Sequence, residues 1–253
     1  MKRNQIRDLA LTSVFAAIIL VMTFVPSLGY ILVGITELTL IHIPVLIGVF
    51  LLPKRYAVVL GLIFGLGSML KAIQVNTGLA IAFINPLVAI LPRLIFVILA
   101  ILIFKGLKLV FEKTKQGDVY IFGFVSLISV VSVFYASNAI GTFTGWNVSW
   151  LNLISLIVAA LLITFYFAFI KGKNKDRVLY PSVMLISTVV HTLLVLFSIL
   201  LFSKDLLYSL FQTEDVIGIL VTIAVTNGLV EALLAALIGT PIIIALKQIE
   251  ERA

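Results

Sequence analysis

Runs of apolar residues long enough to cross a membrane follow one another along almost the whole chain, with short polar breaks between them. About 20 such residues in a helix cross a hydrocarbon core roughly 30 Å thick. Hydrophobic residues make up 62% of the 253 residues and charged residues only 11%, whereas a soluble domain has about 25% charged residues. Because lipid offers no partner for unpaired backbone groups, each run is expected to be helical. The sequence therefore predicts an all-α, polytopic membrane protein forming a single integral membrane domain over residues 1–253.

Eight spans are expected from the apolar runs. They lie near residues 6–25, 37–52, 56–72, 83–111, 119–141, 150–170, 178–202 and 217–247. The first run follows a basic start, as a signal peptide does, but lacks a small-x-small cleavage site before Pro26. We therefore expect it to remain as the first span.

Lys and Arg are distributed unevenly between the two sides that these spans define. If the N-terminus is cytoplasmic, only Lys71 and Lys204 lie outside, and 15 basic residues lie inside, in the segments 1–7, 53–55, 105–118, 171–177 and 247–253. Basic residues near span ends resist translocation. Both termini are therefore predicted to be cytoplasmic, and the net charge of +7 is assigned to membrane orientation rather than to nucleic acid.

Polar groups in the second span and in the last two spans point to a cavity for a small polar molecule. Ionisable groups inside spans are costly and usually face the bundle interior, a water-filled cavity or a partner. Thr39 and His42 are three residues apart and are expected to share a helix face, where they either line an occupied cavity or bond to neighbouring helices. Asn227 and Glu231 share a face of the last span, and His191 lies in the span before it.

Arg93 lies about ten residues below the outer end of its span, or about 15 Å at helical rise. Its guanidinium stays charged in proteins and so needs an anionic partner. Glu231 at comparable depth is one candidate, and an anionic ligand is the other. The two are compatible if the ligand competes with Glu231.

Two pairs of small residues, Ser13 with Ala17 and Gly61 with Gly65, are spaced four apart. Such pairs let helices approach closely. They serve either packing within this chain or docking of another membrane protein.

Four stretches carry a resemblance to a known family: HIPVLIGVFLLPKRYAVVLGLIFGLGSML, NPLVAILPRLIF, STVVHTLLVL and TNGLVEALLAALIGTPIIIAL, in this order. They resemble the substrate-binding S component of energy-coupling factor (ECF) vitamin transporters. The resemblance covers roughly residues 6–111 and 178–247 and implies a six-span core. Residues 119–170 would then form an inserted two-helix hairpin.

The resemblance implies that the chain captures a vitamin at the outer face of the bacterial cell membrane. It would work with a transmembrane coupling protein and two cytoplasmic ATPases, which agrees with the absence of a GxxxxGK[ST] phosphate loop here. Pantothenate is the favoured ligand, since Arg93 and Lys71 could meet its carboxylate. The expected substrate-binding residues are Thr39, His42, Asn85, Arg93, His191, Asn227 and Glu231. The expected docking residues are Ser13, Ala17, Gly61 and Gly65, with Ser13 standing where the family has Ala.

The sequence bears on two other function classes. A self-sufficient secondary transporter often shows inverted repeats, and no convincing repeat relates the two halves of this sequence. A membrane enzyme usually needs clustered carboxylates or His pairs, but the two His lie on different expected spans and there is no cysteine. No catalytic residue, cofactor or metal-ligand spacing is therefore expected.

Overall fold

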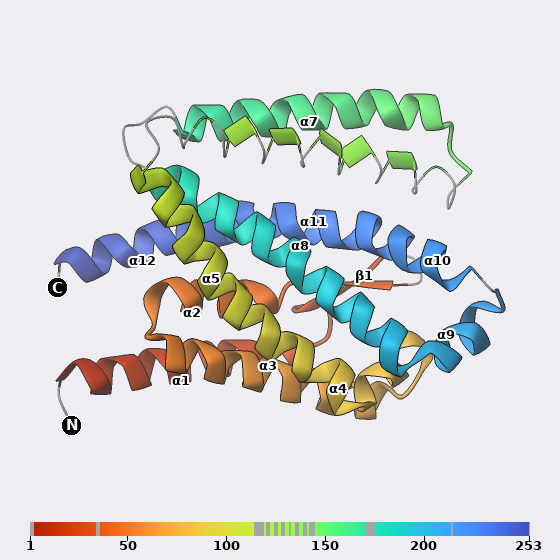
Figure 1. The fold of residues 1–253 in the computed structure, drawn as a ribbon, viewed down its shortest axis with the longest axis horizontal. Helices are drawn as coiled ribbons and strands as arrows, with labels where there is room; N and C mark the ends of the chain where they lie inside the picture. Colours follow the sequence, from red (N-terminus) through yellow and green to blue (C-terminus); the bar gives the residue numbers. More distant parts are fainter. Residues whose placement is uncertain are drawn as a thin grey trace.

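A computed structural model describes residues 3–33, 36–113, 145–170, 176–213 and 215–252, with isolated positions between 119 and 141. Over these residues the chain is a helical bundle with one short β-hairpin (Figure 1). The elements in chain order are α1 (Arg3–Phe24), β1 (Tyr30–Val33), β2 (Thr36–Thr39), α2 (His42–Leu51), α3 (Lys54–Val75), the 3-10 helix η1 (Gly78–Ile84), α4 (Pro86–Ala89), α5 (Leu91–Lys113), α7 (Val148–Ile170), α8 (Asp176–Phe202), α9 (Lys204–Phe211), α10 (Val216–Ile223), the π-helical turn η2 (Ala224–Gly228), α11 (Leu229–Leu234), the π-helical turn η3 (Ala235–Gly239) and α12 (Thr240–Arg252).

The helices confirm a polytopic helical membrane protein. Within the described residues, five stretches are long and apolar enough to cross a membrane, namely Gln5–Phe24, Lys54–Val75, Pro86–Lys113, Val178–Phe202 and Val216–Glu250. The shorter apolar helices are α2 and the Val148–Leu161 part of α7. Nearly half of the residues of the expected span 119–141 lie outside the described residues, so the total of eight spans and the inserted hairpin stay predictions.

The β-hairpin differs from the all-helical expectation. β1 and β2 are antiparallel, with Tyr30 opposite Thr39 and Leu32 opposite Glu37. The second span was expected from residue 37, but α2 begins at His42. The expectation that Thr39 and His42 share a helix face is therefore wrong, because Thr39 ends a strand. Pairing with β1 gives the backbone N–H and C=O groups of β2 hydrogen-bond partners. An isolated extended segment at the end of a span would lack these partners.

The chain is irregular between α3 and α5, at the side where the hairpin also lies. α3 ends as Asn76 adopts a left-handed conformation with φ of 44°, a common way to stop a helix. After η1, the Asn85 side chain accepts a hydrogen bond of 3.0 Å from the Leu87 N–H, and Pro86 takes the first position of α4. This path brings Arg93 into the first turn of α5.

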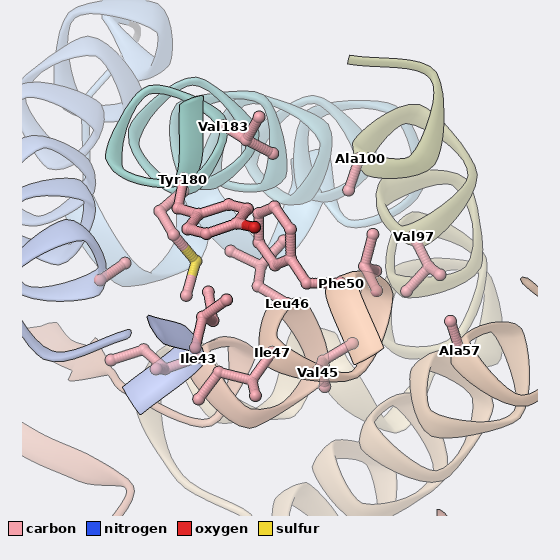
Figure 2. Packing of buried hydrophobic residues seen from close by; sticks show 14 of the residues in the cluster. Ile43, Val45, Leu46, Ile47, Phe50, Ala57, Val97, Ala100, Tyr180 and Val183 are labelled. Carbon is pink, nitrogen blue, oxygen red and sulfur yellow. The ribbon is translucent and has the colours of Figure 1, made fainter. Parts of the chain in front are cut away.

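α2 occupies the middle of the bundle, and nine of its ten residues are buried. Figure 2 shows Phe50 of α2 beside Tyr180 of α8, with Val97 and Ala100 of α5 close by. The Phe50 ring meets the rings of Tyr180 and Phe104 edge to face, with centroids 5.2 and 5.0 Å apart. A helix that is apolar on all sides is a buried helix, so the polar His42 at its start lies in the interior.

The two pairs of small residues have different surroundings. A Cβ atom on Gly61 would lie 2.7 Å from Val97 Cγ2, and one on Gly65 would lie 2.8 Å from Ile90 Cα. Both glycines therefore permit the close approach of α3 to the α4–α5 segment within this chain. Ser13 and Ala17 are exposed on α1, so this face is open to lipid or to another membrane protein.

α1 and α12 place the first and last described residues at the same end of the bundle (Figure 1). Arg7 Nη1 lies 2.7 Å from Glu250 Oε1. Lys247 Nζ donates a hydrogen bond of 2.7 Å to the Tyr180 hydroxyl. Polar contacts between α1, α8 and α12 thus stabilise this end of the bundle. The irregular segment 76–90 lies at the opposite end.

Candidate functional site

A cavity of about 340 Å³ lies between the β-hairpin, α3, η1, α8 and the last helical stretch. Its polar lining consists of Tyr30, Glu37, Thr39, Ser68, Lys71, Thr77, Arg93, His191, Thr192, Asn227 and Glu231. Its apolar lining includes Val75, Leu79, Phe83, Val195, Leu196, Ile199 and Ile223. A concave site with apolar walls and a few convergent polar groups is typical of small-molecule binding.

Helical periodicity explains why α3 and α8 contribute the residues that they do. On α3, Ser68, Lys71 and Val75 lie three and then four positions apart, so they share one face. On α8, His191 and Val195 are four apart and face the cavity in the same way. Each helix therefore presents a mixed polar and apolar stripe to the cavity.

The last helical stretch widens where it meets the cavity. Asn227 lies in the π-helical turn η2, and such turns occur frequently at functional sites. A Cβ atom on Gly228 in the same turn would lie 2.7 Å from Thr192 Cγ2, so this glycine allows close contact with α8. One turn later, the Glu231 carboxylate accepts a hydrogen bond of 3.4 Å from the Thr192 hydroxyl.

The β-hairpin forms one wall of the cavity and is held in place at both strands. The Tyr30 hydroxyl lies 3.3 Å from the Ser68 hydroxyl, and burial raises the pKa of the Tyr30 phenol, which therefore stays neutral. Glu231 Oε1 accepts a hydrogen bond of 2.6 Å from the Thr39 N–H. Asn227 Nδ2 donates one of 3.4 Å to the Glu37 carbonyl. The hairpin over residues 30–39, called the lid below, is thus held by hydrogen bonds to α3 and to the last helical stretch.

Arg93 brings a positive charge to the cavity that is only partly compensated. The residue is 5% exposed, Nη1 donates to the Val88 carbonyl at 2.7 Å, and Nε has no hydrogen-bond partner among the described residues. The guanidinium carbon lies 4.8 Å from the centre of the Phe83 ring and 5.4 Å from that of Phe64. Over the described residues no carboxylate oxygen lies within 4.0 Å of Arg93. Glu231 acts on it only at longer range.

His42 and His191 meet beneath the cavity. Their rings are stacked with centroids 5.6 Å apart. Among the described residues no nitrogen of either ring makes a hydrogen bond of good geometry, although the backbone of Thr39 lies near the His42 ring. His191 also packs against the ring of Phe96, at 4.7 Å between centroids. One donor atom from each His and a Glu231 carboxylate oxygen lie within 4.8 Å of one another.

Five of the seven expected substrate-binding residues line the cavity, namely Thr39, Arg93, His191, Asn227 and Glu231. Asn85 serves instead as the cap of α4. His42 lies under the lining, fully buried.

Sequence reasoning left other lining residues out of the expected set. Tyr30, Ser68 and Thr192 line the cavity but are absent from the expected set. Lys71 was named as a partner for a carboxylate but not placed in the site. The polar stretch that begins at Lys71, together with the face that this residue shares with Ser68, was the signal available for α3.

The family of the chain follows from a comparison with protein-family models. The model for the ECF transporter, substrate-specific component, matches residues 7–143, more than half of the 253 residues. The chain belongs to this family. An ECF substrate-specific component is a transport protein and not an enzyme, which removes the enzyme alternative. A search of curated proteins found no match.

The matched region of this ECF substrate-specific component contains the lid, α3 and Arg93. The walls formed by α8 and the last helical stretch lie beyond it, and so do His191 and Glu231. The match also runs through residues 119–141, which the sequence had predicted to be the first half of an insertion.

Proposed function

We propose that this ECF substrate-specific component captures a small vitamin that carries an anionic group. It takes the vitamin from the outer face and passes it inward with a transmembrane coupling protein and two cytoplasmic ATPases. The observation that carries the proposal is the cavity beside the β-hairpin, into which Arg93 brings a charge without a paired carboxylate among the described residues. A buried guanidinium of this kind is a binding group for a carboxylate or phosphate.

Pantothenate is the vitamin that we propose. Arg93 and Lys71 supply positive charge for its carboxylate, and Thr192, Asn227 and Glu231 supply hydrogen-bonding groups for its hydroxyls and amide. The apolar walls suit its dimethyl group. The volume of about 340 Å³ is near the lower limit of roughly 300 Å³ for small-molecule pockets, which favours a compact ligand.

Two closely related ligands test this assignment. Pantothenate and pantothenol differ in that the carboxylate is replaced by a hydroxymethyl group, so calorimetric titration of both into the purified chain isolates the contribution of the carboxylate. We expect pantothenate to bind and pantothenol to bind at least tenfold more weakly. Equal affinities would contradict the role of the positive charges. Absence of binding by both would reject pantothenate, and mass spectrometry of molecules retained by the purified chain would then identify the ligand class.

Energy coupling is tested in vesicles. Vesicles that contain the chain together with its coupling protein and ATPases should take up the vitamin only with ATP. Vesicles that contain the chain alone should show binding without accumulation, even with an ion gradient. Accumulation by the chain alone would instead establish a self-sufficient secondary transporter.

The exposed face of α1 is the proposed contact with the coupling protein. Ser13 and Ala17 are small and exposed, with Val14 and Ile18 beside them at 56% and 41% exposure. The Ser13 hydroxyl donates to the Leu9 carbonyl of its own helix at 3.0 Å, so it does not require a partner in lipid. A helix face with small side chains permits close contact with another helix.

A further inference from the structure

Both histidines of the chain lie in one buried cluster. The sequence contains two histidines and no cysteine, and the fold stacks His42 of α2 against His191 of α8. Glu231 of α11 completes the group. Three helices that are distant in the sequence thus direct all the nitrogen ligands that the chain has to one point.

The cluster leaves strong polar atoms without partners. Within the part of the chain that the structure describes, both nitrogens of His42 and both nitrogens of His191 are buried and make no hydrogen bond of good geometry. The stacked arrangement of the rings, with 23° between their planes, keeps each ring from donating to the other. Buried polar groups in proteins are normally paired. Unpaired ring nitrogens on two neighbouring histidines therefore indicate that a ligand binds between them.

We propose that His42, His191 and Glu231 bind a divalent transition-metal ion at the floor of the cavity. Two imidazoles and one carboxylate form a common ligand set for a four-coordinate metal with one open position. Imidazole favours Zn²⁺, Co²⁺, Ni²⁺ or Cu²⁺ over Mg²⁺ and Ca²⁺, which take oxygen ligands.

The distances between the three possible ligand atoms are compatible with such an ion. Metal–ligand distances of about 2.0 to 2.2 Å put tetrahedral donors about 3.4 Å apart. The three donor atoms lie within 4.8 Å of one another, so rotations of the side chains can close the site. Because His191 and Glu231 line the cavity and His42 does not, the open position faces the cavity, where a water molecule or an oxygen of the transported ligand completes the coordination.

Arg93 limits how tightly the ion binds. Its guanidinium lines the same cavity and acts electrostatically on both His191 and Glu231, so it opposes a second positive charge there. Removal of this charge in Arg93→Gln should therefore keep or raise the affinity for the metal.

The test uses the full chain, purified with a tag that contains no histidine, stripped with a chelator and titrated with Co²⁺. We expect one Co²⁺ per chain, with the strong visible absorption of a four-coordinate site, displaced by Zn²⁺. His42→Phe should fold, since it places an apolar ring in an apolar core, and should weaken Co²⁺ binding at least tenfold. His191→Gln and Glu231→Gln should do the same, whereas the surface control Glu112→Gln should bind like the unaltered chain.

Several results would overturn the proposal. They are the lack of saturable Co²⁺ or Zn²⁺ binding by the unaltered chain, unchanged affinity in a His42→Phe variant whose melting temperature shows that it is folded, and loss of binding in Arg93→Gln. The titration contains no vitamin, so failure here leaves the proposed function standing. Failure of pantothenate to bind likewise leaves the metal site untouched.

Discussion

Replacement of Arg93 by Gln separates ligand capture from a structural role. The side chain makes one hydrogen bond within the described residues, to the Val88 carbonyl at 2.7 Å, and its other contacts are the faces of two Phe rings. Nε has no partner. The guanidinium therefore has donors left for an anion, and Gln keeps a single amide donor group without the charge.

The expected loss of binding free energy in Arg93→Gln follows from these contacts. Truncating one member of a desolvated, hydrogen-bonded charge pair costs about 2 to 5 kcal/mol, or roughly 30- to 4,000-fold in Kd, since each 1.4 kcal/mol is about tenfold. We expect pantothenate affinity to fall at least 30-fold in Arg93→Gln. Unfolding stability should stay the same or rise, because a buried charge without a carboxylate partner is removed. Arg93→Lys keeps the charge but loses the forked geometry and should lie between the two.

Calorimetric titrations of the two variants and the unaltered chain, each with its melting temperature in the absence of ligand, provide the measurement. Unchanged affinity together with a large fall in melting temperature would refute the reasoning. That pattern would mean that Arg93 is paired within the protein after all, with Glu231 as the carboxylate of comparable depth.

Four further predictions concern the lid, the docking face, the packing and the orientation. Glu231→Ala removes the acceptor of the half-buried Thr39 N–H, which should cost about 1 to 3 kcal/mol of stability, whereas Glu231→Gln keeps an acceptor and should cost less, as denaturation curves would show. Ala17→Trp should abolish copurification with the coupling protein but leave vitamin binding intact, and persistent copurification would place the contact elsewhere. Gly65→Leu should destabilise the chain by about 1 to 3 kcal/mol or more through overpacking, whereas Gly106→Leu, with nothing within 4 Å of its added Cβ, should be nearly neutral in the same melts. A cysteine at Lys115 should resist an impermeant thiol reagent in intact cells, and its labelling would reverse the proposed topology.

The sequence was informative where one property decides the structure of a segment. The apolar run expected as a span over residues 56–72 can only be a helix in lipid, and the structure forms α3 (Lys54–Val75) there. The buried Arg93 was identifiable from its depth in an apolar span, because a charge in that position needs a special environment. Asn227 and Glu231 share a helix face by spacing alone, and both line the cavity.

The sequence was less informative where the answer depends on contacts between distant segments. Residues 37–39 were expected to be the polar start of a span, and only pairing with residues 30–33 and contacts with the last helical stretch make them part of strand β2. The meeting of His42 and His191 depends on how α2 packs against α8, which no local spacing encodes. Asn85 was taken for a ligand contact although its position before Pro86 is also a helix-cap signature.

The lid has a kinetic consequence. A two-stranded hairpin of four residues per strand is marginal in isolation, so its closed position depends on the hydroxyl pair of Tyr30 and Ser68 and on the Thr39 and Glu37 contacts to the last helical stretch. We expect that breaking these contacts opens the cavity without unfolding the bundle. The residence time of a bound molecule should then follow the opening rate of the hairpin rather than any motion of the helices. Hydrogen exchange at the Thr39 amide, read against that of amides in α2, would report this opening rate directly.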